Sequence, residues 1–347
     1  MMKSWETITE IPAEEELTVE TEAAASTVAY LLPISKAASI AQGYLREIYA
    51  SEEDDEESRQ NLNELVERIL NQATQSGDVD DFHNFAVALA RKDEYALACS
   101  VLTCGLQLFP KNVDLLADFL KYGVNCGKSD ECFECYLTLT KIPRLRWTWR
   151  GFVFLVDYLL YLTDRMESIE EIEKRKQEML SITADFKKFY PDSEDAFRTE
   201  AEVFSKLGSK EEEQATLREA LERLEVCPKC ALRYADILFD KGKYDEALEQ
   251  IRRGISDATQ TQSSVSEGYI YYLSGLCLIA KAQKKRMPLT KKEVKEVYAD
   301  FNIAVKEFGD HSSYIDVIRS KTNTLINLTG VEVTEEYASL YDCITEY

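Results

Sequence analysis

Two pairs of cysteines have a spacing that could support metal binding or thiol chemistry, namely Cys132-x-x-Cys135 and Cys227-x-x-Cys230. Four thiolates can hold zinc, and one pair can cycle between dithiol and disulfide when a helix N-terminus lowers a thiol pKa. The two pairs are predicted to lie on helices two or more repeating units apart, which is too far for one zinc ion. Redox proteins place this motif after a strand, and no strand pattern precedes Cys227. We therefore expect reduced thiols, with no metal and no other cofactor.

A cysteine nucleophile would need a histidine beside it. His83 shares a predicted helix pair with Cys99 and Cys104, but the hydrophobic periodicity places both thiols at core positions. The acidic runs at 52–57 and 211–213 lack the loop glycines of a calcium site and are interpreted as solvated segments. Gly-rich phosphate loops are missing from the sequence. The sequence thus predicts no catalytic residue, and we do not expect an enzyme.

The composition is that of a globular protein, with 45% hydrophobic and 30% charged residues and only 13 Gly and 7 Pro in 347 residues. No apolar run approaches the ~20 residues that span a bilayer, and the acidic start differs from the basic start of an export signal. Nine cysteines without a framework spacing are typical of a reducing compartment. We expect a cytoplasmic protein.

The formal net charge is −22, and residues 1–60 alone contain fourteen acidic and four basic side chains. A surface of this charge repels phosphate backbones and anionic membranes. The sequence therefore predicts no nucleic-acid partner and no membrane partner, and favours a protein or peptide with a basic or mixed-charge surface.

Helical periodicity begins after an acidic N-terminal segment. Residues 1–58 are expected to be disordered, apart from short helices that could form on either side of Pro33. Residues 59–78 are predicted to form a capping helix, because apolar residues recur at i, i+3, i+4, i+7 and i+8. These are Leu62, Leu65, Val66, Ile69 and Leu70.

A pattern then repeats along the chain. DEYALACSVLTCGLQLFP at 93–110 and GKYDEALEQIRRGI at 242–255 share a turn residue, an aromatic, a small residue, and apolar positions four, seven and eight residues later. Asp93 and Gly127 occupy the same turn position 34 residues apart, as do Gly208 and Gly242. A fixed period of this length indicates a helical repeat protein.

GKYDEALEQIRRGI resembles the second helix of the tetratricopeptide repeat family. The resemblance implies an all-α, right-handed α-solenoid of helix-turn-helix repeats with helical caps. Repeats are expected over 79–260, with an expanded unit at about 146–191. A divergent repeat and C-terminal capping helices are expected over 261–347, including a basic loop at 281–292 that is interpreted as solvated.

In this family, the first helices of successive repeats line a groove that holds a peptide or a partner helix. The repeat phase assigns to that groove seven residues: His83, Asn84, Lys121, Asn125, Arg198, Arg233 and Asp236. The set of lysines and asparagines with which some members hold a chaperone tail is incomplete, so we do not expect that ligand.

A second candidate site is the cluster IPRLRWTWRGF at 142–152. Its members are Arg144, Arg146, Trp147, Trp149 and Arg150. Trp and Arg are enriched among the residues that dominate protein interfaces. The same cluster could instead be structural, with tryptophan in the core and arginines paired to local carboxylates. The sequence leaves both interpretations open.

We therefore predict a non-catalytic adaptor, scaffold or regulatory subunit that binds a partner through the solenoid groove. The alternative is a ligand- or partner-responsive sensor that regulates a separately encoded effector enzyme in a signalling or defence system, since the expanded units could line a binding face. The sequence does not specify the partner, the oligomeric state or the role of residues 1–58.

Overall fold

The computed structural model describes residues 39–46, 56–73, 78–261, 267–285, 289–308, 317, 318 and 320. Within these ranges every regular element is a helix, so the predicted all-α fold is confirmed. Two compact units are present, residues 1–110 and 111–347. The segment 1–58, predicted to be disordered, and the C-terminal capping helices expected after residue 308 fall largely outside the described residues.

Unit 1 contains α2 (Glu56–Ala73), α3 (Val79–Ala90) and α4 (Tyr95–Leu108), together with a helical segment at residues 39–46. Helices α3 and α4 form a pair, and α2 packs on α4. Phe82 and Phe85 on one face of α3 are fully buried, as is Leu102 of α4. Residues three or four apart share a helix face, and this spacing therefore creates the apolar side that holds the pair together.

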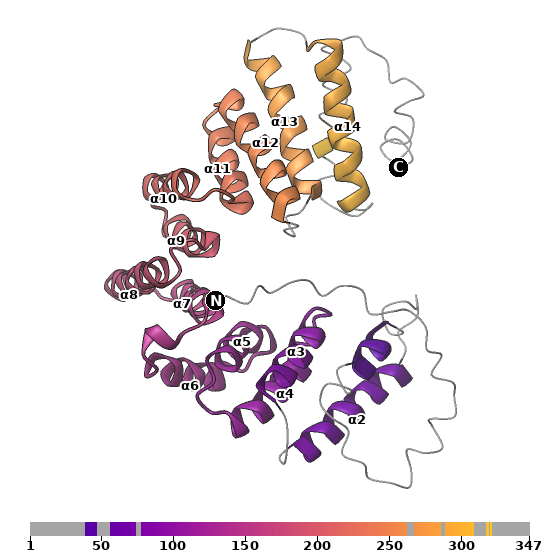
Figure 1. The fold of residues 1–347 in the computed structure, drawn as a ribbon, viewed down its shortest axis with the longest axis vertical. Coiled ribbons are helices and arrows are strands. Elements are labelled where there is room, and N and C mark those ends of the chain that lie inside the picture. Colours follow the sequence, from indigo (N-terminus) through magenta and orange to yellow (C-terminus); the bar gives the residue numbers. More distant parts are fainter. Residues whose placement is uncertain are drawn as a thin grey trace. The chain divides into compact units, whose positions relative to one another are not determined.

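Unit 2 is built of helix pairs (Figure 1). The pairs are α5 (Val113–Gly123) with α6 (Ser129–Thr140), α7 (Trp149–Thr163) with α8 (Ile169–Phe189), α9 (Glu194–Lys206) with α10 (Lys210–Arg223), α11 (Pro228–Asp240) with α12 (Tyr244–Thr261), and α13 (Glu267–Lys285) with α14 (Lys291–Phe308). Single turns η2 (Val124–Cys126) and η3 (Arg144–Arg146) lie in the connections.

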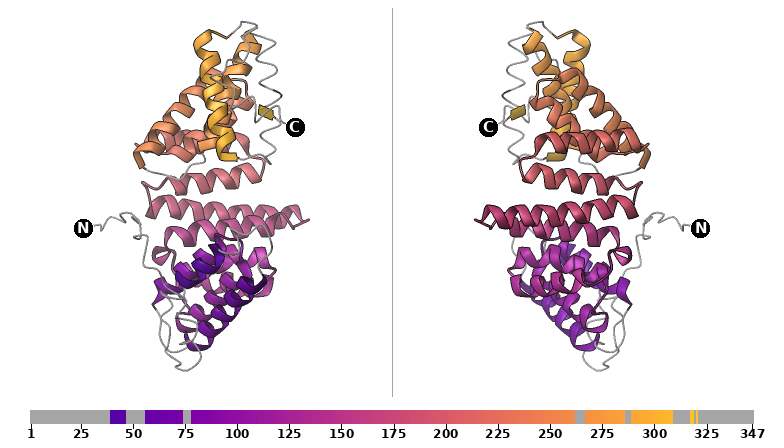
Figure 2. Two further views of the ribbon diagram at one scale, coloured as in Figure 1. Left: turned by 90° about the vertical axis from the view of Figure 1, so that its right-hand side faces the viewer. Right: turned by 90° about the vertical axis from the view of Figure 1, so that its left-hand side faces the viewer.

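The first helices of these pairs contact one another in series: α5 with α7, α7 with α9, α9 with α11, and α11 with α13. Three second helices also contact the first helix of the next pair: α8 contacts α9, α10 contacts α11, and α12 contacts α13. Helices α7–α10 stack side by side (Figure 2). We use the term first-helix face for the solvent-facing side chains of α5, α7, α9, α11 and α13.

The turns between paired helices confirm the predicted repeat phase. Asp93, Gly127, Gly208 and Gly242 have φ values of 60°, 74°, 73° and 69°, and they are the positive-φ residues of the described chain. A left-handed residue ends a helix by turning the chain back, and glycine adopts this conformation without a Cβ clash. The four positions predicted from spacing alone therefore share one backbone geometry.

Substituting Gly208 by alanine is expected to lower the free energy of unfolding by about 1 kcal/mol. The added Cβ would have nothing within 4 Å, so the cost comes from the left-handed backbone alone. Urea denaturation measures the effect. The matched control is Gly43→Ala, at a helical position that is also open, where alanine should leave stability unchanged or raise it. Equal losses for both variants would contradict the prediction.

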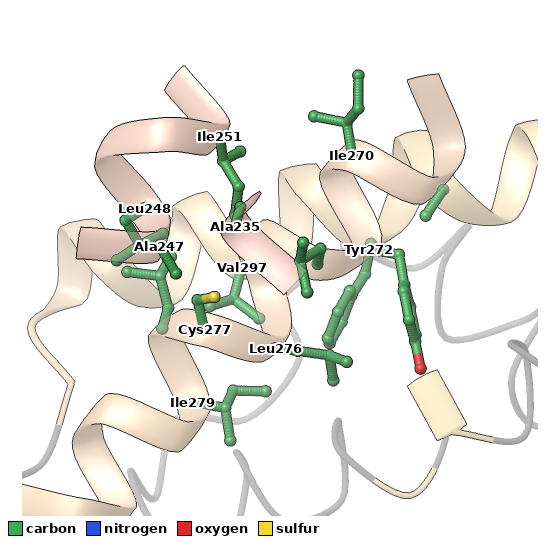
Figure 3. Packing of buried hydrophobic residues seen from close by; sticks show 14 of the residues in the cluster. Ala235, Ala247, Leu248, Ile251, Ile270, Tyr272, Leu276, Cys277, Ile279 and Val297 are labelled. Atoms are coloured by element: carbon green, nitrogen blue, oxygen red, sulfur yellow. The ribbon is translucent and has the colours of Figure 1, made fainter. Parts of the chain in front are cut away.

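The core of the last two helix pairs of unit 2 is one continuous apolar cluster (Figure 3). Ala235 of α11, Ala247 of α12, Cys277 of α13 and Val297 of α14 are each fully buried in it. Small side chains at Ala235 and Ala247 allow α11 and α12 to approach closely. The α14 end of the cluster is fixed by a capping box, in which the Thr290 backbone N–H donates to the Glu293 carboxylate at 2.8 Å.

Two segments expected to be solvated contain residues that pair with a charge on another helix pair. The basic segment 281–292 is not a simple loop, because α13 continues to Lys285. Lys281 and Lys285 form ion pairs of 2.6 and 3.1 Å with Asp245 of the preceding pair. Glu213, in the acidic run 211–213, is 5% exposed and accepts a 2.9 Å hydrogen bond from Arg233 of α11. In both segments the contact is made with an opposite charge on a neighbouring helix pair, and Glu213 is buried by it.

Candidate functional site

Thr148 caps α7 and thereby decides where the two neighbouring tryptophans lie. Its side chain accepts a hydrogen bond from the Gly151 N–H at 3.3 Å. Trp147 precedes this cap and packs on Phe152 of the first helical turns, with ring centroids 5.1 Å apart, as in a hydrophobic staple. The Trp147 indole donates to the Ile142 carbonyl at 3.0 Å and is 3% exposed. Trp147 is a core residue, which removes it from the candidate partner-binding set.

Trp149 is the first residue of α7, and 41% of its surface is exposed. Its ring meets the Phe154 ring edge-on at a centroid distance of 6.2 Å. The Arg150 guanidinium lies 5.2 Å from the centre of the indole. An indole held between a ring and a cation is oriented although it faces solvent.

Of the other two arginines in the 142–152 cluster, one has a structural role and one is exposed as a partner-binding residue would be. Arg144 forms a 2.7 Å ion pair with Asp185 of α8 and donates to the Ser181 carbonyl, so it joins η3 to α8. Arg146 is exposed, and its side chain has no hydrogen bond or ion pair to the described residues. Arg144 is structural, and the position of Arg146 leaves its guanidinium available to a partner.

Three aromatic residues of α7 lie beside basic side chains, and we call Trp149, Phe154 and Tyr161 the α7 stripe. Phe154 is buried in it and Tyr161 is half-buried, at a spacing of seven residues that returns to the same helix face. The exposed Lys121 of α5 places its ammonium 4.4 Å from the centre of the Phe154 ring. The Arg165 guanidinium lies 3.5 Å from the centre of the Tyr161 ring. Each aromatic ring of the α7 stripe therefore carries a cation on its surface.

Asp157 lies between Phe154 and Tyr161 on the α7 stripe. Its carboxyl reaches solvent, but side chains of α5, α7 and α9 displace much of the surrounding water, and this desolvation raises its pKa to about 6. Arg198 and Lys121 act in the opposite direction, and Glu202 adds to the rise. The carboxyl is thus the acidic centre of a surface framed by cations from neighbouring helices.

The first-helix face continues over α9 and α11 as a mixture of paired charges. Arg198 forms a 3.2 Å ion pair with Asp195. Asp236 of α11 accepts a 2.8 Å hydrogen bond from the Tyr269 hydroxyl of α13. Burial raises the Asp236 pKa, and the bond from Tyr269 opposes this rise. Arg233, Arg198 and Asp236 therefore lie on the predicted helices but already have partners within the chain.

The remaining predicted residues lie in different surroundings. Asn125 is exposed in η2, where its amide donates to the Lys121 carbonyl at 3.0 Å. His83 and Asn84 lie on α3 in unit 1. His83 is 9% exposed, whereas Asn84 is exposed. The structure thus groups Lys121 and Asn125 with the α7 stripe, and His83 is a buried residue rather than a surface one.

Four residues of this surface were not identified from the sequence: Phe154, Asp157, Tyr161 and Arg165. Asp157 was visible as a single acidic residue within the apolar run 151–162. A charged residue on an otherwise apolar helix must reach solvent, and positions three and four away share its face. That rule would have placed Phe154 and Tyr161 on the same face of α7 as Asp157.

The Cys227-x-x-Cys230 pair lies at the start of α11 with both side chains fully buried. Burial raises the pKa of Cys227 to about 11 and also raises that of Cys230. The helix N-terminus is occupied by carboxylates: the Cys227 N–H donates to Asp257 at 3.0 Å, and the Cys230 N–H donates to Glu194 at 2.7 Å. Both thiols are buried core residues, and burial outweighs the opposing effect of the Arg253 guanidinium on the pKa of Cys227.

Cys132 and Cys135 on α6 are likewise buried, and burial raises the pKa of each to about 12. In the part of the chain that the structure describes, no cluster of three or more His, Cys, Asp or Glu residues is arranged to hold a metal ion. Over the same residues, no helix combines the length and the apolar character needed to cross a bilayer.

No protein-family model and no curated protein sequence matches this chain. Solved structures do match. A tetratricopeptide repeat protein from Parabacteroides merdae is 13% identical, with 84% of this chain and 100% of that chain covered at a TM-score of 0.48. Human IFIT1, solved as a dimer with m7Gppp-AAAA, is 12% identical, with 90% and 73% covered at 0.45.

A tetratricopeptide repeat protein from Thermus thermophilus is 21% identical, with 52% of this chain and 92% of that chain covered at a TM-score of 0.43. The chain's own helix pairs and its left-handed turns at repeat spacing carry the structural argument. The chain is an all-helical repeat protein, similar in fold to these solved tetratricopeptide repeat proteins.

Proposed function

We propose that the chain binds a partner protein or peptide on the first-helix face of unit 2, with Trp149 at the centre of the contact. The observation that carries the proposal is the 41% exposure of this indole two residues from a tryptophan that is 3% exposed. Burying the exposed part of an indole against a partner is favourable, and Trp is prominent among the residues that dominate interface energies.

The geometry around Trp149 supports a binding role. Phe154 and Arg150 hold the ring, so little side-chain freedom would be lost on association. Arg146, three residues before Trp149, and Asn125 in η2 are both exposed, and they supply hydrogen-bond donors for a polar rim. On this proposal the chain is an adaptor, scaffold or regulatory subunit and does not catalyse a reaction.

The proposal includes a cytoplasmic location, because buried cysteines that are not joined in disulfides are typical of a reducing compartment. The alternative of a ligand-responsive sensor would require the expanded unit to form a binding surface of its own. The expansion of the 146–191 unit lengthens α8, a second helix of 21 residues, and so adds little to the first-helix face.

Nucleic acid is the alternative that a test must separate from a protein partner, since human IFIT1 was solved with m7Gppp-AAAA. A net charge of −22 opposes association with a long polyanion. An exposed indole and a mixed-charge surround suit a peptide better. We therefore propose a protein partner. The similarity to an RNA-bound structure does not support the prediction that nucleic acid is not a partner.

A photo-crosslinking amino acid at position 125, beside Lys121, should capture the partner in native extract. The same group at Arg218, which is exposed on α10, is the control for non-specific capture. Adding Trp149→Ala to the position-125 protein should reduce the crosslinked yield roughly tenfold or more, as expected for a hot-spot side chain. The product is identified by mass spectrometry after protease or ribonuclease treatment.

Three outcomes would count against this proposal. Equal yields from positions 125 and 218 would mean that the first-helix face is not the contact surface. An unchanged yield with Trp149→Ala would mean that the indole is not the anchor. A product removed by ribonuclease but not by protease would identify nucleic acid as the partner.

A further inference from the structure

The solvent side of α7 contains a row of cations, each placed on an aromatic ring of the α7 stripe. The row consists of Arg150 on Trp149, Lys121 on Phe154 and Arg165 on Tyr161, at 5.2, 4.4 and 3.5 Å from the ring centres. We refer to these three basic residues as the cation row. They come from two helices, α5 and α7, and from the turn that follows α7.

Stacking on a ring orients a cation without neutralising its charge. The Lys121 ammonium and the Arg165 guanidinium have no carboxylate within ion-pair distance among the described residues, and the Arg165 guanidinium donates to the Tyr161 carbonyl at 2.9 Å. Most other charges of the first-helix face are paired, as Arg198 is with Asp195 and Arg233 is with Glu213. The cation row therefore presents two cations without an ion-pair partner among the described residues, beside the single carboxyl of Asp157, on a strongly acidic protein.

From this arrangement we infer that the cation row receives an acidic peptide segment of the partner, with carboxylates on Lys121 and Arg165 and an apolar side chain on Trp149. The inference rests on the proposed function and specifies its ligand. The net charge of the whole chain predicts a basic or mixed-charge partner. The local surface favours an acidic segment, because the charges that face a ligand at short range act more strongly than charges a Debye length away.

The observations favour a peptide over RNA as the source of the negative charge. A peptide can place an apolar side chain on Trp149 and carboxylates on two cations at the same time. A nucleic acid would bring one phosphate per nucleotide, and these additional charges would face the acidic remainder of the chain.

Asp157 lies within the cation row and gives binding a predictable pH dependence. The charged groups that face its carboxyl are Lys121 from α5 and Arg198 and Glu202 from α9. Because its pKa is raised to about 6, Asp157 is largely ionised at pH 7 and largely neutral at pH 5.5. Protonation removes a negative charge that repels the ligand, so acidic-peptide binding should strengthen as the pH falls across this interval.

The test uses fluorescence anisotropy with the full chain and a labelled eight-residue peptide that contains Asp residues and one Phe. The comparison probes are the same peptide with Lys in place of Asp, the same with Asn in place of Asp, and an oligoadenylate of equal length. The acidic peptide should bind most tightly. The double variant Lys121→Glu, Arg165→Glu should weaken its binding roughly tenfold.

The charge-matched control is the double variant Lys174→Glu, Arg218→Glu, at exposed positions on the second helices α8 and α10, which should bind as the unmodified chain does. Circular dichroism confirms that the variants remain helical. Between pH 7 and pH 5.5 the unmodified chain should gain roughly two- to fourfold in affinity, and Asp157→Asn should abolish this gain. A flat pH profile for the unmodified chain would contradict the role assigned to Asp157.

Tighter binding of the Lys or Asn peptide, or of oligoadenylate, would overturn the inference, as would equal losses for the row variant and the control. Failure here is distinguishable from failure of the proposed function. If position 125 still captures a protein that depends on Trp149, the contact surface stands and only the acidic character of the ligand is wrong.

Discussion

Replacing Phe152 by alanine is expected to lower the free energy of unfolding by about 4 kcal/mol. The ring is fully buried between α7 and α8, stacked on Phe186 at 4.8 Å with an interplanar angle of 5°. Trp147 and Tyr190 meet its other sides at 5.1 and 6.1 Å. Removing the ring leaves a cavity among aromatic side chains that cannot collapse to fill it, so the lost transfer energy and the cavity cost add.

Urea denaturation followed by far-ultraviolet circular dichroism measures this loss. The control is Phe133→Ala on α6, where the ring is 47% exposed and truncation should cost no more than about 1 kcal/mol. Similar losses for Phe152→Ala and Phe133→Ala would show that the aromatic cluster does not hold α7 against α8. Because the staple places Trp147 on the same ring, Phe152→Ala should also alter the fluorescence of that indole.

The different positions of Trp147 and Trp149 show what the sequence could settle and what it left open. Thr148 is a favoured N-cap residue, and the pattern of an apolar residue before the cap and another four positions into the helix predicts a staple. Trp147 and Phe152 fit that pattern. Local capping rules could therefore have assigned Trp147 to the core. They do not determine the exposure of Trp149, because that depends on which helices pack beside the start of α7.

The fold itself was predictable because its signal is periodic. Turn residues spaced 34 apart fix where each helix ends, and the four φ values between 60° and 74° confirm that spacing. Charge pairs between helix pairs were not predictable in the same way. Lys281 meets Asp245 across 36 positions, and Arg233 meets Glu213 across 20. Such pairs depend on how neighbouring repeats pack, which the local pattern of charges does not contain.

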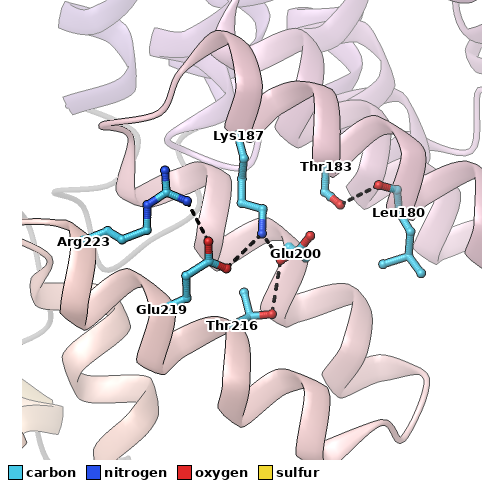
Figure 4. A network of polar contacts seen from close by, with 7 residues as sticks. All are labelled: Leu180, Thr183, Lys187, Glu200, Thr216, Glu219 and Arg223. Carbon is cyan, nitrogen blue, oxygen red and sulfur yellow. Dashed lines mark hydrogen bonds and ion pairs between the residues drawn. The ribbon is translucent and has the colours of Figure 1, made fainter.

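Substituting Lys187 by methionine is expected to lower the free energy of unfolding by about 3 kcal/mol at neutral pH. Lys187 belongs to α8, and its ammonium lies 2.6 Å from the Glu200 carboxylate of α9 and 3.3 Å from the Glu219 carboxylate of α10 (Figure 4). The side chain therefore connects three helices. Thr216 donates to the same Glu200 oxygen at 3.2 Å, and Arg223 pairs with Glu219 at 2.7 Å. Without the lysine, the Glu200 side chain, 12% exposed, keeps a negative charge with only a hydroxyl beside it.

The matched control is Lys188→Met, since Lys188 is the next residue of α8, is exposed and forms no ion pair with a described carboxylate. Its effect should stay within about 0.5 kcal/mol. Urea denaturation of both variants at neutral pH makes the comparison. Equal stability of the two variants would mean that the three-helix contact contributes nothing measurable.

The pH dependence separates a lost ion pair from lost packing. Burial alone would raise the pKa of Glu219, but the hydrogen bonds and charges of Arg223 and Lys187 outweigh it and hold that pKa below its ordinary value of 4.5. A carboxyl with a lowered folded-state pKa stabilises the fold above its unfolded-state pKa, and this contribution disappears as the pH falls through the folded-state value. The gap between the unmodified chain and Lys187→Met should therefore be largest near neutral pH and should shrink below pH 4.5. A gap that stays constant on acidification would mean that Lys187 acts through the packing of its methylene chain and not through its charge.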